Sequence, residues 1–170
     1  MSRLILVDSG PILHLHEIKK IYLFRIFKER ELIVSNIIMN ELANYNVSLE
    51  GLEKEGLRLT VSHVRRKDIR DMQTSVKDYR LHDGDVSIIL LSLKFKPELV
   101  MTDDMELRKA IVDNNLKPVG TFGIVMKAWK EGIISKNEVD DIVRDLFERS
   151  TLYLSKGFKK YIIELLKSTL

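Results

Sequence analysis

Five short apolar segments recur along the first 119 residues, and each pattern is typical of a β-strand. The expected strands are Arg3–Val7, Leu32–Val34, Leu57–Val61, Leu99–Met101 and Lys117–Val119. The third alternates apolar and polar residues, so we expect it to be half-exposed. Because longer helical patterns lie between these segments, the chain predicts a parallel α/β sheet that is covered on both faces.

Helical periodicity and capping residues predict helices between the strands and after the last of them. The expected helices are Ile12–Phe27, Ile37–Tyr45, Leu49–Glu55, Arg65–Arg80, Val86–Phe95, one ending near Asn114, one ending at Lys130, Asn137–Arg149 and Lys156–Lys167. We expect the first to break near Lys19, and either Ser35 or Asn36 to cap the second. The last two predict a helical extension over residues 134–170, packed on a main domain of residues 1–133.

Composition narrows the kinds of site that the chain can hold. It has 170 residues, of which 45% are hydrophobic and 31% charged, a balance typical of a globular protein. The lack of cysteine excludes a disulfide scaffold, a thiolate zinc site, an iron–sulfur cluster and a cysteine nucleophile. The net charge of +3 permits a polyanionic partner without requiring one. No apolar run resembles a signal peptide or a membrane span, so we expect a cytoplasmic protein.

Acidic residues follow two of the expected strands. Asp8 comes directly after the first strand, and Asp103 and Asp104 come shortly after the fourth. In open parallel sheets, active sites lie just outside the carboxyl ends of the strands. If these two strands are near neighbours, the three carboxylates converge.

Two further acids lie within apolar helices. Glu41 shares a helical face with Ile37, Ile38 and Tyr45, so we expect it to point toward the core. Asp85 begins a helix that is almost entirely apolar, so we expect it to lie deep in the fold. An unpaired buried carboxylate costs roughly several kcal/mol or takes up a proton, so each needs a compensating partner.

More than one partner is open to these acids. Glu41 could pair with Lys19, Arg25 or another cationic side chain, and Asp83 and Asp85 could simply cap a helix. A metal cation is the alternative that would explain all the acids together. His14 and His16, two residues apart, do not face one another on a helix, so a histidine zinc site is disfavoured. A carboxylate cluster binds Mg²⁺ or Mn²⁺, and phosphodiester hydrolysis is the reaction that such a site best supports.

Two other features predict partners. The basic residues Arg65, Arg66, Lys67 and Arg80 lead toward the acids and could hold an RNA backbone, although a solvated helix face is the alternative. The segment Ile12–Phe27 contains more apolar residues than one buried face requires. That surplus predicts a homodimer or partner surface near the first helices.

An ordered set of short motifs resembles the PIN-domain family, in its standalone prokaryotic, VapC-toxin-like branch. The motifs are Asp8-Ser9-Gly10-Pro11, Asn40-Glu41-Leu42, Gly84-Asp85, Met101-Thr102-Asp103-Asp104, Val119-Gly120-Thr121-Phe122-Gly123, Glu131-Gly132-Ile133-Ile134 and Tyr153-Leu154-Ser155. The resemblance covers nearly the whole chain. It implies a three-layer α/β/α fold and a Mg²⁺- or Mn²⁺-dependent endoribonuclease, the toxin of a toxin–antitoxin pair with an antitoxin protein as partner.

The resemblance also implies roles for individual residues. It places the catalytic acids at Asp8, Glu41, Asp85 and either Asp103 or Asp104, with the metal held by Asp8, Asp85 and these last two. Ser9 and Thr102 match positions that orient the acids. Asp85 departs from the branch, which more often has glutamate there, and this leaves room for a non-catalytic RNA- or protein-binding module on the same scaffold.

Overall fold

The computed structural model describes residues 3–168, and its centre is one sheet of parallel strands. The strands are β1 Leu4–Val7, β2 Glu31–Ser35, β3 Arg58–Ser62, β4 Leu99–Met101 and β5 Pro118–Val119. Their order in the sheet is β3-β2-β1-β4-β5, with β1 in the middle. Ile5, Leu6 and Val7 are fully buried, as expected for a central strand that is covered on both faces. The predicted α/β sheet is confirmed.

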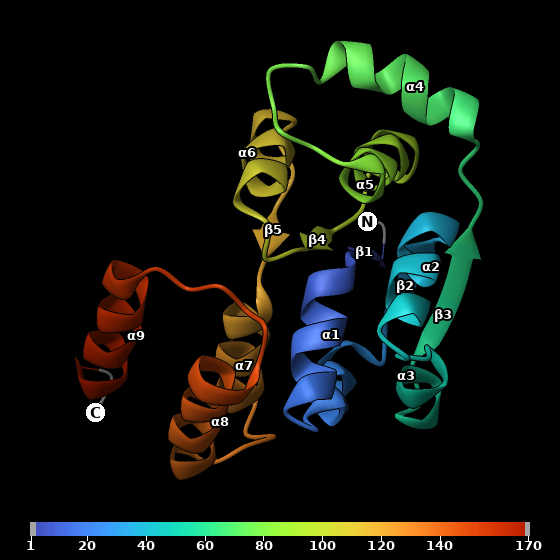
Figure 1. Ribbon diagram of the computed structural model, residues 1–170. Coiled ribbons are helices and arrows are strands. Elements are labelled where there is room, and N and C mark those ends of the chain that lie inside the picture. Colours follow the sequence, from blue (N-terminus) through green and yellow to red (C-terminus); the bar gives the residue numbers. More distant parts are fainter. Residues whose placement is uncertain (1–2, 169–170) are drawn as a thin grey trace.

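Helices form a layer on each face of this sheet. They are α1 Ser9–Glu17, the 3₁₀ helix η1 Ile21–Phe27, α2 Asn36–Asn44, α3 Glu50–Lys54, α4 Arg66–Ser75, α5 Asp83–Phe95, α6 Met105–Asp113, α7 Thr121–Lys130, α8 Lys136–Arg149 and α9 Lys156–Ser168. Figure 1 shows α4, α5 and α6 on one side of the strands and α1, α7 and α8 on the other. The architecture is the three-layer α/β/α arrangement.

The first helical segment breaks where the sequence predicted a break. Lys19 has a φ of 59°, and the chain continues as η1 rather than as an α-helix. In η1, Leu23, Phe24, Ile26 and Phe27 are all buried within the same chain. The apolar surplus therefore packs internally, so it no longer argues for a dimer surface at these helices.

The polar helix expected over Arg65–Arg80 is shorter in the structure. α4 ends at Ser75, and the chain turns at Val76, whose side chain is buried. The hydroxyl of Tyr79 in the following loop donates to Asp113. The buried Val76 side chain and the Tyr79–Asp113 hydrogen bond hold the loop off the axis of α4. Helical periodicity alone therefore predicted a longer helix than the structure has.

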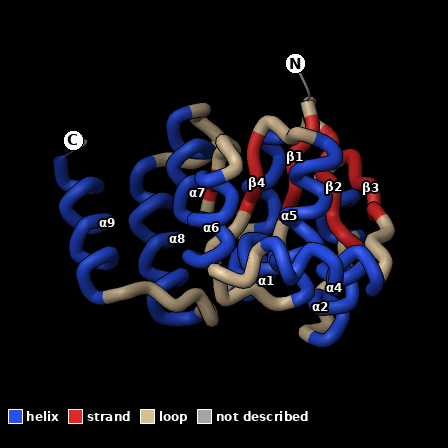
Figure 2. Tube along the Cα trace, turned by 90° about the horizontal axis from the view of Figure 1, so that it is seen from above, coloured by secondary structure: helices blue, strands red, loops and turns tan. Residues whose placement is uncertain are grey.

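The C-terminal helices extend the layer that contains α1 and α7. Figure 2 shows α8 and α9 to one side of the strands. Val139, Ile142 and Leu146 of α8 are buried and belong to the main core, and Phe158 of α9 makes an edge-to-face contact with Phe122 of α7. The domain boundary at residue 134 stays a prediction. Within residues 3–168, no helix is both long enough and apolar enough to cross a membrane.

Candidate active site

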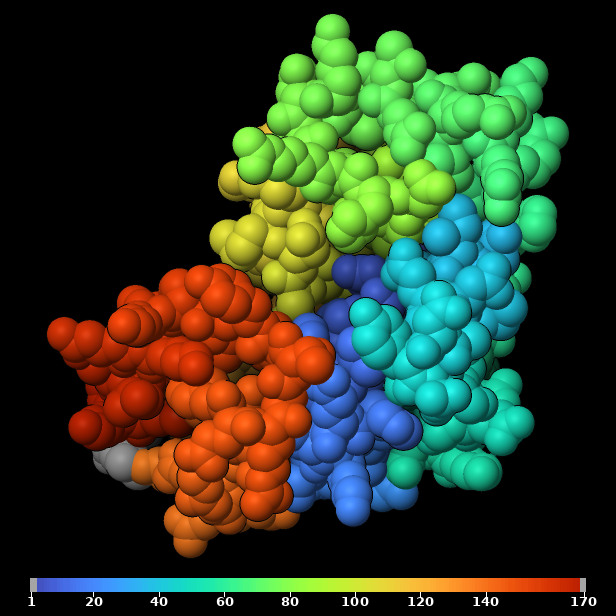
Figure 3. Space-filling model, viewed as in Figure 1, coloured from blue at the N-terminus to red at the C-terminus, as the bar shows by residue number. Residues whose placement is uncertain are grey.

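The chemistry-bearing residues surround one hollow at the carboxyl edge of the sheet. Strand β1 pairs with both β2 and β4, so helices leave the sheet in different directions there, and such a point is where open α/β sheets hold their ligands. The hollow has a volume of about 440 Å³. Figure 3 shows it in the middle of the face, between the blue N-terminal atoms, the green and yellow atoms and the orange segment after α8. Its lining residues are Asp8, Ser9, Gly10, His14, Glu41, His82, Asp85, Asp103, Asp104, Met105, Leu152 and Tyr153.

Asp8 forms the floor of this hollow and caps helix α1. Its Oδ1 accepts a hydrogen bond from the Ser9 backbone N–H at 2.8 Å, and its Oδ2 accepts one from the Thr102 hydroxyl at 2.7 Å. Burial raises the pKa of Asp8 to about 7; the neighbouring Asp85 and Glu41 carboxylates add to this shift, and the hydrogen bond from Thr102 opposes it. The carboxylate is therefore held rigidly in a place where its negative charge is poorly compensated.

Asp85 lies in the first turn of α5, facing the same hollow. It is 3% exposed, as the apolar helix predicted. Its Oδ2 accepts from the His82 backbone N–H at 2.9 Å and lies 2.7 Å from His82 Nδ1. Burial raises the pKa of Asp85 to about 6, with Asp104 and Glu41 adding to the shift and His82 opposing it. One oxygen of Asp85 thus serves the helix cap, which leaves Oδ1 for another partner.

Glu41 reaches the hollow from α2 and is half-buried rather than part of the core. Its Oε2 accepts a hydrogen bond from the Ser9 hydroxyl at 3.0 Å, so its partner is neither Lys19 nor Arg25. The face assignment was wrong for Tyr45, which is 61% exposed because α2 ends one residue before it. Glu41 therefore points along the carboxyl edge of the sheet toward Asp8.

The structure distinguishes Asp103 from Asp104. Oδ1 of Asp103 accepts from the Thr121 backbone N–H at 2.7 Å, while its Oδ2 accepts from the Thr121 hydroxyl at 2.5 Å and lies 2.8 Å from His14 Nδ1. Asp104 caps α6 through Oδ1, which accepts from the Leu107 N–H at 2.7 Å. Protein groups therefore occupy both oxygens of Asp103, whereas Asp104 keeps one oxygen for another ligand.

The acids of the hollow are not neutralised by basic side chains. In the described part of the chain, no lysine or arginine forms an ion pair with Asp8, Glu41, Asp85 or Asp104, and the one histidine beside this set is His82, next to Asp85. Among residues 3–168, three carboxylate oxygens of this set have no hydrogen-bond partner, namely Glu41 Oε1, Asp85 Oδ1 and Asp104 Oδ2.

This donor set fits a hard divalent cation by its chemistry. Oxygen-only ligands with uncompensated negative charge are what Mg²⁺ and Mn²⁺ prefer. The described residues do not, however, hold three acidic or histidine side chains close enough to form a ready-made metal cage. Like charges repel, and each carboxylate has turned toward a protein donor such as Thr102, His82 or the α6 backbone.

The basic residues that the sequence suggested for RNA do not line the hollow. Arg65 forms an ion pair with Asp68, with Nη2 and Oδ1 2.8 Å apart. Arg66 and Lys67 are exposed at the start of α4, and Arg80 is also exposed. Lys109 is the main group that lowers the pKa of Glu106, and Arg80 adds to this effect. Glu106 follows Met105, which lines the hollow, so this interaction places Arg80 near the rim.

Sequence reasoning assigned no site role to six residues that line the hollow, namely Gly10, His14, His82, Met105, Leu152 and Tyr153. His14 braces Asp103, and Met105, Leu152 and Tyr153 form an apolar rim. The helix assignments gave no reason to bring Tyr153 back to the N-terminal acids, since the two are far apart in the chain. The alternation of Leu152, Tyr153 and Leu154 could have indicated that the tyrosine faces away from its neighbours.

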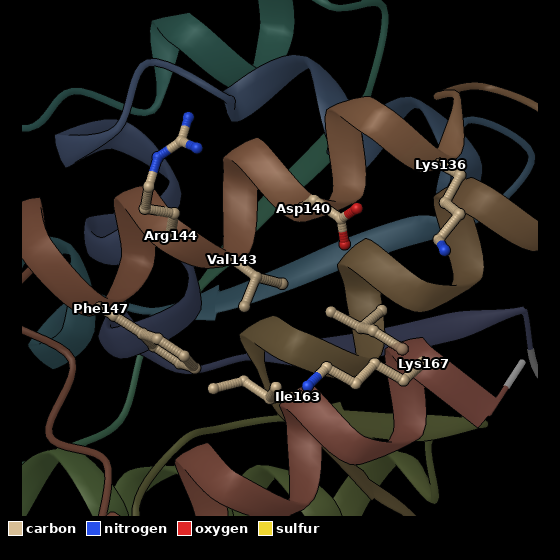
Figure 4. A pocket seen from close by; sticks show the side chains of 8 residues that line it. Lys136, Asp140, Val143, Arg144, Phe147, Ile163 and Lys167 are labelled. Atoms are coloured by element: carbon tan, nitrogen blue, oxygen red, sulfur yellow. The ribbon is translucent and has the colours of Figure 1, made fainter. Parts of the chain in front are cut away.

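A second hollow lies between α8 and α9 and has a different character. Its volume is about 490 Å³, and Figure 4 shows Val143, Phe147 and Ile163 on its walls with Asp140 as the acidic side chain. A single carboxylate among apolar and basic side chains does not provide the ligands for metal-dependent hydrolysis. The acidic hollow is therefore the candidate active site.

Comparisons with known proteins agree with this fold. A family model described as a PIN domain matches residues 4–168. A solved structure, a PilT N-terminus domain protein from the hyperthermophilic archaeon Sulfolobus solfataricus, is similar with a TM-score of 0.50 and 7% identity, covering 89% of this chain and 99% of that one. A search of curated proteins finds no match. The family match spans all the elements described above, so the chain belongs to the PIN-domain family and has its nuclease-type α/β/α fold.

Proposed function

We propose that the chain is a Mg²⁺- or Mn²⁺-dependent endoribonuclease that hydrolyses phosphodiester bonds of RNA. The observation that carries this proposal is the meeting of Asp8, Glu41, Asp85 and Asp104 in one hollow without a lysine or arginine counter-ion among the described residues. Those acids come from four separate segments, so their convergence is a property of the fold. The family to which the chain belongs has a nuclease-type fold, which supports the same reading.

The residues divide into ligands and supports. Asp8, Asp85 and Asp104 would hold the cation, with Glu41 as a further ligand. When bound, a divalent cation neutralises charge on the phosphate and lowers the pKa of a water molecule. Thr102 and Ser9 fix the orientation of Asp8 and Glu41 through hydrogen bonds. Asp103, with both oxygens occupied, would brace the N-terminus of α7 rather than bind the metal.

Electrostatics explains why such a site needs its cation before it can bind RNA. A phosphate that enters the hollow meets several carboxylates at short range, and like charges repel strongly where water is partly excluded. Exposed Arg80, Arg66 and Lys67 would attract the backbone outside the hollow, in an interaction that salt screens. We expect Arg80→Ala to weaken RNA binding more than Arg65→Ala, because Arg65 is already paired with Asp68.

Substitution of two acids tests the proposed reaction. We expect Asp8→Asn and Asp104→Asn each to reduce Mn²⁺-dependent cleavage of a labelled RNA by on the order of a hundredfold or more. Asp140→Asn, at an exposed acid on α8, is the matched control and should cleave like the original chain. Full cleavage by both Asp8→Asn and Asp104→Asn would rule out this centre.

One observation favours a non-catalytic alternative on the same scaffold. Asp85 is shorter than the glutamate that this branch of the family more often has, and its Oδ2 is already paired with His82. A weakened ligand there would leave an RNA- or protein-binding module without turnover. Calorimetric titration with millimolar MgCl₂ or MnCl₂ separates the two functions, since the module predicts no binding.

The biological setting is also part of the proposal. The resemblance to VapC-like proteins supports a toxin that an antitoxin protein holds inactive, and it supports a homodimer. Growth arrest on induced expression of the original chain, but not of Asp8→Asn, would support the toxin role. Light scattering after size exclusion at micromolar concentration tests the dimer, and a single monomer peak would contradict it.

A further inference from the structure

The segment between α8 and α9, residues 150–155, passes beside the acidic hollow. Two hydrogen bonds tie it to α1: Glu17 Oε2 accepts from the Thr151 backbone N–H at 2.7 Å, and Oε1 accepts from the Thr151 hydroxyl at 2.9 Å. The Ser150 hydroxyl donates to the Leu146 carbonyl at 2.7 Å. These contacts give a segment without regular secondary structure a defined path past the hollow.

Along this path the side chains alternate in direction. Leu152 and Leu154 are half-buried, whereas Tyr153 between them is 89% exposed. Tyr153 nevertheless lines the hollow together with the acids. The ring of Tyr153 is therefore open to solvent beside the hollow, where it can contact a ligand that the hollow binds.

The rim and the floor of the hollow differ in chemistry. The floor carries Asp8, Asp85 and Asp104, while the rim carries Tyr153 and Met105, which is 66% exposed. A nucleotide has the same two parts, since its phosphate needs a cation on the acidic floor and its base has an apolar face. Base–aromatic stacking tolerates any sequence because every base has a π-face.

We propose that Tyr153 is a stacking platform for an unpaired base next to the bond that is cut. This inference rests on the proposed function and adds a residue that positions the RNA in the hollow. In an RNA duplex the bases are stacked on one another and their faces are covered, so a duplex cannot offer a base to this ring.

Other exposed aromatic residues provide a contrast. Tyr45 is 61% exposed but lies beyond the end of α2 and does not line the hollow. Phe158 and Tyr161 contact one another, with ring centroids 6.2 Å apart. Tyr45→Ala is therefore the matched control, since it removes an exposed tyrosine side chain that does not line the hollow.

The test measures binding and cleavage of a fluorescein-labelled 12-nucleotide single-stranded RNA. Binding is read by fluorescence anisotropy in CaCl₂, with gels confirming that the RNA stays intact, and cleavage is read as kcat and KM in MnCl₂. We expect Tyr153→Ala to weaken binding and raise KM by between about fivefold and about a hundredfold, the range for loss of one base–aromatic stack. Tyr153→Phe should stay within about twofold, because it keeps the ring, and Tyr45→Ala should match the original chain.

An abasic scan of the same RNA separates stacking from a structural role. With the original chain, we expect removal of one particular base to weaken binding as much as Tyr153→Ala does. With Tyr153→Ala, removal of that base should have no further effect, because the stack is already absent. A merely destabilised variant would instead lose affinity equally for every oligonucleotide.

The outcomes distinguish this inference from the proposed function. Unchanged binding by Tyr153→Ala, equal binding of the duplex form, or additive losses in the abasic scan would each overturn the stacking role. Ring-dependent binding without cleavage in MnCl₂ would instead uphold the stacking role and overturn the nuclease proposal.

Discussion

A β-carbon at Gly84 would lie 2.3 Å from Oε1 of Glu41, far inside van der Waals contact. The first turn of α5 thus has a glycine where the carboxylate from α2 packs against its backbone. This close approach places Glu41 beside Asp85, the residue that follows Gly84. The position of the acid therefore depends on the absence of a side chain on a different helix.

Gly84→Ala should displace Glu41 without unfolding the chain. Alanine is favoured over glycine in helices by about 0.5–1 kcal/mol, which offsets part of the clash with the flexible carboxylate. We expect a thermal midpoint within a few degrees of the original, and a loss of kcat on the order of a hundredfold from the misplaced acid. Gly51→Ala is the matched control, because its β-carbon would meet only Ile21 Cγ2 at an ordinary 3.9 Å. Unimpaired cleavage by Gly84→Ala would remove Glu41 from the mechanism.

Stability without metal should fall as the pH rises. The pKa of Asp8 is raised from 3.8 to about 7, so the folded chain keeps a proton that the unfolded chain has already lost. Folding therefore takes up protons between these two values, and the stability present below about pH 4 is lost as the pH passes through about 7. Asp8→Asn should be more stable than the original chain at pH 8 and similar to it at pH 4. Urea unfolding in EDTA at several pH values measures this, and a stability that rises from pH 5 to pH 8 would contradict the raised pKa.

Divalent cations should remove this loss of folding stability at high pH. A cation that binds only the folded chain stabilises it by mass action, and binding competes with the proton on Asp8. We expect millimolar MnCl₂ to raise the thermal midpoint more at pH 8 than at pH 5. The Asp104→Asn variant should show a smaller increase, whereas Asp140→Asn should respond like the original chain. An equal response of all three chains would place cation binding elsewhere.

Substitutions at Asp103 and at Asp104 should differ in their effects on stability and on cleavage. Asp103→Ala leaves the Thr121 backbone N–H without its acceptor, so we expect a loss of stability of about 1–3 kcal/mol. Cleavage per folded molecule should fall less for Asp103→Ala than for Asp104→Asn. Denaturant unfolding together with cleavage well below the thermal midpoint gives the two readouts. The reverse ranking in cleavage would make Asp103 the metal ligand, as the resemblance allowed.

Local patterns along the chain predicted much of the framework. Short apolar runs predicted the strands, and Asp8 and Asp104 were expected at the carboxyl ends of two of them. Such features depend on neighbouring residues, through capping, periodicity and turn formation. The burial of Asp85 also followed from its own apolar helix.

Contacts between segments that are distant in the sequence decided the features of the site that local patterns did not predict. Asp103 and Asp104 are adjacent in the sequence, and only the approach of Thr121 and His14 shows which one is occupied. The fit of Glu41 against Gly84 and the return of Tyr153 to the acids also join residues that are far apart in the chain. The sequence by itself therefore determined most of the elements, their order along the chain and the strand ends that carry acids, because these follow from local chemistry. Only the tertiary structure decided which oxygens remain without protein partners, because that depends on which side chains the packing brings together.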